Sequence, residues 1–154
     1  MNVYELMRAS GKALMMNGGN NTHSGNLSMR DPQDEDVFYI TASGSQGGAL
    51  IPRDIVPVKF SDVGWGDARG STESTIHRRF LRLPGAGAGL HAHFLESAFI
   101  SFDTKEKQLI LRFLGTDSKG REEFLFQPVD LYGAFAVGQV RVGSYEQPVG
   151  SAEM

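Results

Sequence analysis

Apolar residues recur with helical spacing over the first sixteen positions of the chain. The members of this stripe, which share one face of a helix, are Val3, Leu6, Met7, Ala13 and Leu14. The segment Asn17-Gly18-Gly19 follows, and glycine at this place is typical of a helix end. The pattern therefore predicts a helix over residues 3–16.

Short runs of apolar residues predict three strands next. Residues 27–29 and 37–40 flank residues 31–36, a segment of Asp, Pro, Gln and Glu that is typical of a turn. These two runs are therefore expected to pair as a hairpin. A third strand is expected at residues 56–60, where every second side chain is apolar.

A second helix is expected after Ser71, a residue that can act as its N-cap. Its apolar positions are Ile76, Phe80 and Leu83. Pro84-Gly85 would end it. Residues 90–94 then predict a buried strand, and the apolar residues after them predict a short helix. The members of that last group are Leu95, Ala98, Phe99 and Phe102.

The rest of the chain predicts mainly strand. Residues 108–114 and 124–126 are expected to form a second hairpin around a turn at residues 117–120. The stretch from residue 129 onward is rich in glycine and β-branched residues, and its strand positions are Val137, Val140 and Val142. Helices and mainly antiparallel strands thus alternate, which predicts an α/β sandwich with an antiparallel-rich sheet.

The composition is that of one globular domain. Apolar residues make up 40% and charged residues 21% of the 154 positions, which excludes a disordered or fibrous chain. Cysteine is absent, so a metal ion would have to be held by His, Asp or Glu. Glycine occupies 19 positions, about 12% against a usual value near 7%, and its clusters indicate tight loops.

Charge and hydropathy narrow the range of partners. The net charge is −3, with no stripe of basic residues, so nucleic acid is not expected as a partner. No apolar run approaches the roughly 18–20 residues that cross a bilayer, and the first residues lack the basic and apolar regions of a secretory signal. We therefore expect a cytoplasmic protein with no membrane partner.

His91-Ala92-His93 is the sharpest local feature. In a strand, the first and third residues of such a segment project from one face with Cα atoms about 6.6 Å apart. Two imidazoles placed in this way can share a divalent ion. The same spacing also occurs on ordinary edge strands, so at this point both a metal site and a plain strand remain open.

Three segments of small and polar residues could bind an anion. Ser71-Thr72-Glu73 precedes the second helix, where hydroxyls and free backbone N–H groups suit a phosphate or carboxylate. The alternative is that Ser71 only caps the helix and Glu73 only complements its dipole. Gly25-Asn26 and Thr41-Ala42-Ser43-Gly44 could likewise cradle a phosphate or serve as simple turns.

The order of these motifs resembles the class II aldolase/adducin family, whose members include L-fuculose-1-phosphate aldolase and L-ribulose-5-phosphate 4-epimerase. The segments that carry the resemblance are Gly25-Asn26-Leu27-Ser28-Met29-Arg30, Ile40-Thr41-Ala42-Ser43-Gly44, Asp54-Ile55-Val56-Pro57-Val58, Ser71-Thr72-Glu73 with His77, and His91-Ala92-His93. Residues 142–145 and 148–153 are similar to the family's tyrosine-proline-glycine-threonine/serine segment. The resemblance thus covers nearly the whole chain.

The resemblance implies roles for eight residues. His91 and His93 match two of the family's three zinc-ligand histidines, and Glu73 matches the carboxylate that acts as acid and base beside the metal. The positions that hold the substrate phosphate are matched by Asn26, Ser43, Gly44, Ser71 and Thr72. The family fold is a three-layer α/β/α sandwich with a central antiparallel-rich sheet. Its usual assembly is a homotetramer, so a homo-oligomer is expected.

One part of the family pattern is not found in this sequence. Family enzymes have a third ligand histidine well downstream, whereas the other histidines here are His23 and His77. His77 is expected to pack its helix, and His23 to lie on a surface loop. Residues 1–154 are expected to form a single class II aldolase/adducin-like domain that lacks the family's final strand and closing helices and binds its metal weakly.

The expected function is that of a metal-dependent aldolase- or epimerase-type lyase. Its expected ion is zinc, and its substrate is a small phosphorylated or carboxylated hydroxy-carbonyl compound. A metal ion can stabilise an enediolate while a neighbouring carboxylate moves the proton. Aldol cleavage, epimerisation and dehydration share that intermediate, and the sequence leaves the choice open. Two alternatives remain: an inactive interaction module like the adducin head domain, and a shortened enzyme.

Overall fold

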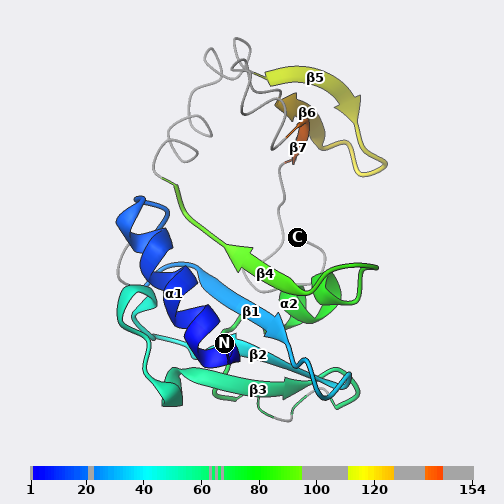
Figure 1. The fold of residues 1–154 in the computed structure, drawn as a ribbon. Helices are drawn as coiled ribbons and strands as arrows, with labels where there is room; N and C mark the ends of the chain where they lie inside the picture. The colour runs from blue at the N-terminus through cyan, green and yellow to red at the C-terminus, as the bar shows by residue number, and fades with distance from the viewer. Residues whose placement is uncertain are drawn as a thin grey trace. The chain divides into compact units, whose positions relative to one another are not determined.

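The computed structural model describes residues 2–20, 23–62, 64, 66, 68–94, 111–126 and 138–143. These residues fall into two compact units, one made of the described residues up to 94 and one made of those from 111 onward (Figure 1). All the candidate site residues belong to the first unit. No helix in the described ranges is both long enough and apolar enough to span a bilayer.

A four-stranded antiparallel sheet forms the centre of the first unit, with the strand order β3-β2-β1-β4. The strands are β1 (Asn26–Arg30), β2 (Val37–Thr41), β3 (Ile55–Lys59) and β4 (Ala88–His91). Two short 3-10 turns, Gly47–Ala49 and Pro52–Asp54, connect β2 to β3. The expected hairpin and the expected third strand are both confirmed.

β4 differs from the sequence-based prediction, which extended it to residue 94. The strand ends at His91. Two residues later, the backbone N–H of His93 donates to the carbonyl of Gly19 at 2.7 Å and to the side chain of Asn20 at 3.0 Å. These bonds to the loop after the first helix take the chain out of the sheet. The helix expected from residue 95 lies outside the described residues.

The first helix, α1 (Val3–Met16), has the predicted bounds. The side chain of Asn2 caps it by accepting a hydrogen bond from the backbone N–H of Glu5 at 2.8 Å. Asn17 ends it, and Gly18 follows with a φ of 70°, the left-handed conformation that glycine adopts without strain.

The second helix, α2 (Ser74–Leu81), begins later than an N-cap at Ser71 would require. Glu73 holds the N-cap position, and the hydroxyl of Ser71 accepts a hydrogen bond from the Glu73 backbone N–H at 3.2 Å. Residues 71–73 therefore form a turn that precedes the helix. At the other end, Arg30 of β1 donates to the carbonyl of Leu81 at 2.5 Å, which satisfies a helix C-terminal acceptor.

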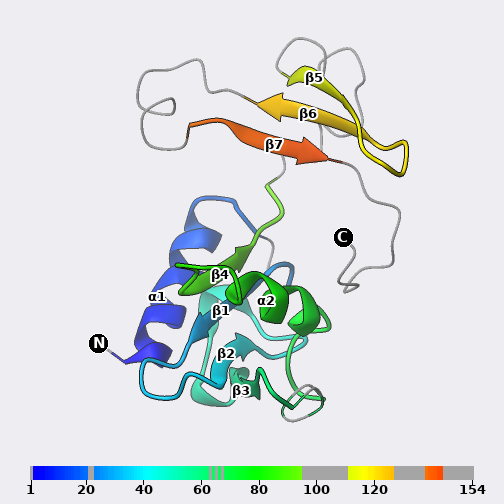
Figure 2. The same ribbon diagram turned by 90° about the vertical axis from the view of Figure 1, so that its right-hand side faces the viewer.

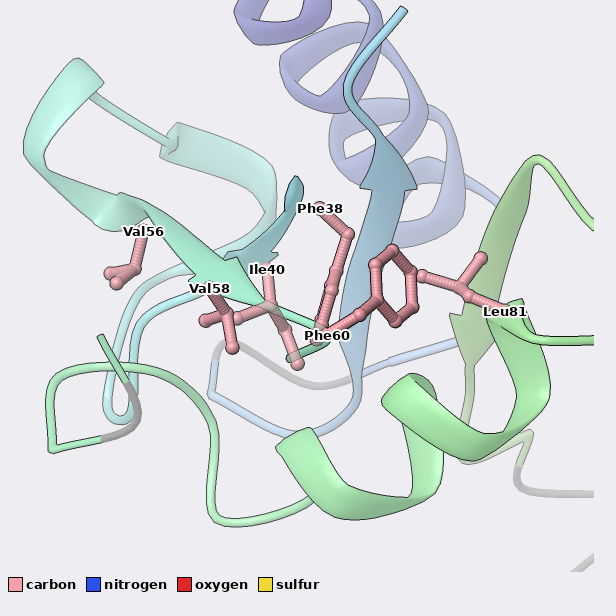
Figure 3. Close-up of a cluster of buried hydrophobic side chains, with 6 residues drawn as sticks. All are labelled: Phe38, Ile40, Val56, Val58, Phe60 and Leu81. Atoms are coloured by element: carbon pink, nitrogen blue, oxygen red, sulfur yellow. The ribbon is translucent and has the colours of Figure 1, made fainter. Parts of the chain in front are cut away.

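The sheet lies between the two helices and gives the predicted α/β fold three layers (Figure 2). A buried cluster joins the α2 side of the sheet to that helix, and Figure 3 shows its members: Phe38, Ile40, Val56, Val58, Phe60 and Leu81. A second cluster, Met7, Leu27 and Leu50, fills the α1 side. Because side chains alternate along a strand, Asn26, Ser28 and Arg30 of β1 all face α2.

The second unit contains an antiparallel sheet with the strand order β5-β6-β7. Its strands are β5 (Leu111–Thr116), β6 (Glu122–Phe126) and β7 (Val140–Gly143). The expected hairpin is confirmed, and its turn is closed by Asp117. The carboxylate accepts hydrogen bonds from the backbone and side chain of Arg121, which lower the pKa of Asp117 to about 2.

Candidate functional site

One pocket of about 250 Å³ in the first unit collects the site residues named from the sequence. It is lined by all eight of them: Asn26, Ser43, Gly44, Ser71, Thr72, Glu73, His91 and His93. These residues come from four segments of the chain that lie up to 67 positions apart. The lining is more polar than apolar in character, as a site for a charged small molecule requires.

The sheet brings the first two segments together. Asn26 begins β1 and lies directly opposite His91 of β4 in the antiparallel pair. Gly25 precedes Asn26 with a φ of 71°, and a Cβ on it would collide with the carbonyl of His91 and the side chain of Asn20. Only glycine therefore allows the chain to enter β1 this close to β4.

The other two segments meet through backbone and hydroxyl bonds. Ala42 forms an isolated bridge with Gly70, and the hydroxyl of Ser43 donates to the carbonyl of Gly70 at 2.8 Å. The turn after β2 is thereby fixed against the turn that precedes α2. This contact places Ser43 and Gly44 on the same pocket as Ser71 and Thr72.

The carboxylate of Glu73 closes the inner side of the pocket. Its side chain is only 6% exposed. One oxygen, Oε2, accepts a hydrogen bond from Asn26 Nδ2 at 2.6 Å and a second from Nδ1 of His91. Burial works to raise the pKa of Glu73, but the bonds from Asn26 and His91 outweigh it and hold the pKa below its usual value. Glu73 is therefore ionised at neutral pH.

This arrangement bears on the capping alternative for Ser71-Thr72-Glu73. The Glu73 side chain makes no capping hydrogen bond to α2, although the residue occupies the N-cap position. The carboxylate instead accepts hydrogen bonds from Asn26 of β1 and His91 of β4. Ser71 does bond a backbone N–H, but in the turn before the helix rather than at a helix N-cap.

His91 and His93 lie side by side, with ring centroids 4.5 Å apart. The sequence-based geometry for this pair assumed a strand through both residues, and that assumption is wrong because β4 ends at His91. The loop that follows nevertheless returns the second imidazole to the first. Because Nδ1 of His91 is bonded to Glu73, Nε2 is the atom of this ring left for a cation.

The pair fits a divalent cation by donor type, since imidazole nitrogen and carboxylate oxygen are ligands for zinc and similar ions. It is a small donor set. Within the described ranges, no group of three or more His, Asp or Glu side chains is arranged as a metal site. The structure thus offers two adjacent imidazoles with a carboxylate behind one of them.

Two histidines take positions that the sequence did not assign to the site. His23 lies on an exposed loop, as expected, but it also lines the pocket, and its Nδ1 is 3.1 Å from the carbonyl of Gly44. His77 lies on the buried face of α2 and packs the helix, as expected, and it also bonds the side chains of Asn26 and Ser28. The one signal for His77 was its place one helical turn after Glu73.

Comparisons with known proteins agree on the family. Residues 5–152 match the family described as Class II Aldolase and Adducin N-terminal domain. Methylthioribulose-1-phosphate dehydratase from Leptospira biflexa is 30% identical over 119 residues, which are 74% of this chain and 52% of that protein. The same enzyme from Microcystis aeruginosa is 37% identical over 83 residues, 51% of this chain and 40% of that protein. The chain thus spans about half the length of these relatives.

Solved structures show the same relationship. L-fuculose-1-phosphate aldolase from Thermus thermophilus superposes with a TM-score of 0.65 at 29% identity, covering 90% of this chain and 60% of that one. YgbL from Escherichia coli gives a TM-score of 0.72 at 22% identity, covering 98% and 65%, and supports the fold alone. The chain belongs to the class II aldolase and adducin family and has its fold.

Proposed function

We propose that the chain acts as a lyase of the class II aldolase type on a small hydroxy-carbonyl phosphate. The observation that carries this proposal is the Glu73 carboxylate, which lies buried at the back of an open polar pocket and is held ionised by Asn26 and His91. An ionised carboxylate in that position is suited to remove a proton from the carbon next to a carbonyl group and to return it later.

The turns around the pocket supply donors for a phosphate. The hydroxyl of Ser71 accepts from the Glu73 backbone, so its own hydrogen can be donated to an anion. Among the described residues, neither the hydroxyl of Thr72 nor the backbone N–H of Gly44 has a hydrogen-bond partner. The hydroxyl of Ser43 is already used on Gly70, so Ser43 would hold the turn rather than the anion. A bound phosphate would orient the reacting carbons toward Glu73.

His91 and His93 would hold a divalent cation, for which zinc is our proposal. The cation would act as a Lewis acid on the substrate carbonyl. Glu73 keeps His91 in the tautomer that carries its proton on Nδ1, which leaves the other ring nitrogen as a ligand. Asn26 in turn fixes the carboxylate oxygen that His91 contacts.

Among the reactions that pass through an enediolate, we propose elimination of water from a sugar phosphate. The support is that the relatives in Leptospira and Microcystis are methylthioribulose-1-phosphate dehydratases. Aldol cleavage is the second candidate, favoured by the 29% identical fuculose-1-phosphate aldolase from Thermus thermophilus. In the elimination, Glu73 would take the proton from the carbon next to the carbonyl, and the hydroxyl of the following carbon would leave as water. In the aldol cleavage, that hydroxyl would lose its proton, the bond between the two carbons would break to give an aldehyde and an enediolate, and Glu73 would return a proton to the enediolate carbon.

The proposal extends to the assembly that the family resemblance implies and to the location expected from the sequence. Residues 1–154 would work as one family domain within a cytoplasmic homotetramer. Leu90 and Phe94, which flank His91 and His93 in the sequence, are 59% and 40% exposed. Apolar side chains exposed in this way are suited to a contact between two copies of the chain. The competing function is an inactive interaction module that keeps the fold without the chemistry.

Deuterium exchange tests the proposal without knowledge of the natural substrate. Zinc-loaded protein is incubated in D₂O with ribulose 1-phosphate, and exchange at the carbons next to the carbonyl is followed by NMR. Glu73→Gln should slow exchange by about 10²–10⁴-fold, because it removes the base. Glu35→Gln is the matched control, and it should exchange at the wild-type rate. Glu35 lies on the exposed turn between β1 and β2, at the other end of β1 from Asn26, and does not line the pocket.

The outcomes separate the candidate functions. Equal exchange rates in wild type and Glu73→Gln would show that the base is another residue. Absence of both exchange and zinc binding in the wild-type protein would favour the interaction module. Exchange followed by release of water, measured by the appearance of a dehydrated product, would favour the dehydratase over the aldolase.

A further inference from the structure

Behind the Glu73 carboxylate, three side chains form a continuous row of hydrogen bonds. Asn26 Nδ2 donates to Glu73 Oε2 at 2.6 Å. The other end of the same amide, Oδ1, bonds Nε2 of His77. On the far side of that ring, Nδ1 lies 2.6 Å from the hydroxyl of Ser28. His77 is 5% exposed, and the row lies between β1 and α2.

The chemistry of each group decides where the protons lie. An ionised carboxylate can only accept, so Asn26 must present its NH₂ group to Glu73 and its carbonyl oxygen to His77. That oxygen also can only accept, so Nε2 of His77 must carry a proton. In a neutral ring Nδ1 then has a lone pair, which accepts the hydrogen of the Ser28 hydroxyl.

Two further observations support a neutral and fixed ring. Burial lowers the pKa of His77 to about 4, although the charge of Glu73 works in the opposite direction. Gly89 of β4 packs directly on the row: a Cβ at this position would lie 2.7 Å from the Ser28 hydroxyl oxygen and 2.9 Å from His77 Nδ1. The absence of a side chain at residue 89 therefore leaves room for the bond between Ser28 and His77.

We propose that His77 is a positioning residue, which as the neutral Nε2–H tautomer fixes the orientation of the Asn26 amide and thereby the Glu73 carboxylate. Without the proton on Nε2, the amide could rotate and turn its oxygen toward the carboxylate, and the two acceptors would repel each other. The orientation of Asn26 stands on the hydrogen bonds alone. Its effect on catalysis rests on the proposed function of Glu73.

The tautomer is tested directly on the wild-type protein. Long-range ¹H–¹⁵N spectra at pH 7 distinguish the two neutral forms of a histidine from each other and from the charged form. The His77 signals are assigned by their loss in His77→Gln. The expected result is a proton on Nε2 and none on Nδ1. A proton on Nδ1, or a charged ring at pH 7, would overturn the proposal.

Two isosteric variants test the coupling to Asn26. In His77→Gln, the side-chain amide nitrogen can occupy the position of Nε2 and still donate to Asn26. In His77→Asn, the shorter side chain extends only to the position of Nδ1. The readout is the pair of Asn26 side-chain N–H signals, assigned by their loss in Asn26→Asp. His77→Gln should keep the signal of the hydrogen atom bonded to Glu73 at its wild-type shift, and His77→Asn should move it toward that of a free amide.

The same variants give a catalytic readout if the wild type exchanges deuterium. His77→Asn should lower the exchange rate by about 10²-fold, the effect expected of a misplaced catalytic group, and His77→Gln should restore most of it. Val58→Ala is the control for general loss of stability, because Val58 is fully buried in the core cluster of β2, β3 and α2 and does not line the pocket. It should lower the melting temperature without moving the Asn26 signals.

The failures are distinguishable. A wild type with the expected tautomer and amide signals but no exchange would leave the positioning role intact and contradict the proposed function. Asn26 signals that respond equally to His77→Gln, His77→Asn and Val58→Ala would show that His77 only packs the helix. Exchange rates equal in His77→Gln and His77→Asn would contradict the catalytic consequence.

Discussion

Asn26 and Glu73 are 47 positions apart in the chain, yet the amide of one donates to the carboxylate of the other at 2.6 Å. The contact joins the first residue of β1 to the N-cap of α2 and so ties the sheet to the helix at the pocket. The carboxylate it holds is the only buried acidic side chain among the described residues.

Acidification should destabilise the protein through His77. Its pKa is lowered to about 4 in the folded protein and is about 6.5 in an unfolded chain. Between these values the unfolded state binds more protons than the folded state, so stability falls as the pH falls from 6.5 to 4. The loss attributable to this one group is about 3 kcal/mol at the lower limit.

Urea unfolding at pH 7 and at pH 4.5 checks this prediction. His77→Gln removes the titrating group at position 77 and leaves the others in place, so it should lose less stability than wild type between the two pH values. Glu73 has a lowered pKa, so its own contribution to stability is lost only as the pH falls below its ordinary value of 4.5. Equal losses in the two proteins would show that His77 does not enter the folded state neutral.

Phosphate should stabilise the fold through the turns around the pocket. A ligand at about 100 times its Kd adds roughly 2.7 kcal/mol to the free energy of unfolding. Thermal melts with increasing phosphate, at constant ionic strength, should therefore show a rising melting temperature. Thr72→Val should weaken the response, because it removes a hydroxyl that lines the pocket.

Thr75→Val is the matched control for that experiment. Thr75 is an exposed residue of α2, three positions from Thr72, and does not line the pocket. It should respond to phosphate like the wild type. A melting temperature that phosphate does not move, or moves equally in Thr72→Val, would argue against an anion site at this turn.

Zinc binding should depend on the pair of adjacent imidazoles. The double variant His91→Ala/His93→Ala should lose the zinc that the wild type binds, since both nitrogen ligands are gone. Titration calorimetry with zinc measures this, and we expect a weaker affinity in the wild type than is usual for a three-histidine site. His77→Gln removes a different imidazole and should retain zinc, so full retention in the double variant would refute the assignment.

Local pattern was enough to predict most of the first unit. The bounds of α1 follow from an apolar stripe and a glycine end, and the β1–β2 hairpin follows from two apolar runs around a turn. The start of α2 and the end of β4 could not be predicted in this way. They depend on bonds from Ser71 and from the loop at Gly19, which no local pattern contains.

The same division holds for the pocket. The order of short motifs named eight of its lining residues, because each motif is a local run of small, polar or histidine residues. The row of hydrogen bonds behind Glu73, through Asn26, His77 and Ser28, was not predicted from the sequence. Its two bonds to His77 span 49 and 51 positions, and nothing near His77 in the sequence indicates which side chains of β1 it will contact.

Gly89→Ala should disturb that row while Gly87→Ala, two residues away in the same segment, should not. A Cβ at residue 89 would lie 2.7 Å from the Ser28 hydroxyl oxygen and 2.9 Å from His77 Nδ1, so the two groups must separate to admit it. A Cβ at residue 87 would meet nothing within 4 Å. Neither glycine has a positive φ, so steric contact alone distinguishes the two variants.

Overpacking of a closed interior costs typically about 1–3 kcal/mol, whereas a glycine replaced in open space stabilises by roughly 0.4–1 kcal/mol, because the unfolded chain loses freedom. The free energy of unfolding, measured with urea, should therefore be equal to or higher than the wild-type value in Gly87→Ala and lower than it in Gly89→Ala. The Asn26 side-chain signal should shift in Gly89→Ala alone. If Gly89→Ala lost stability and left that signal in place, the row of hydrogen bonds would not depend on the space at residue 89.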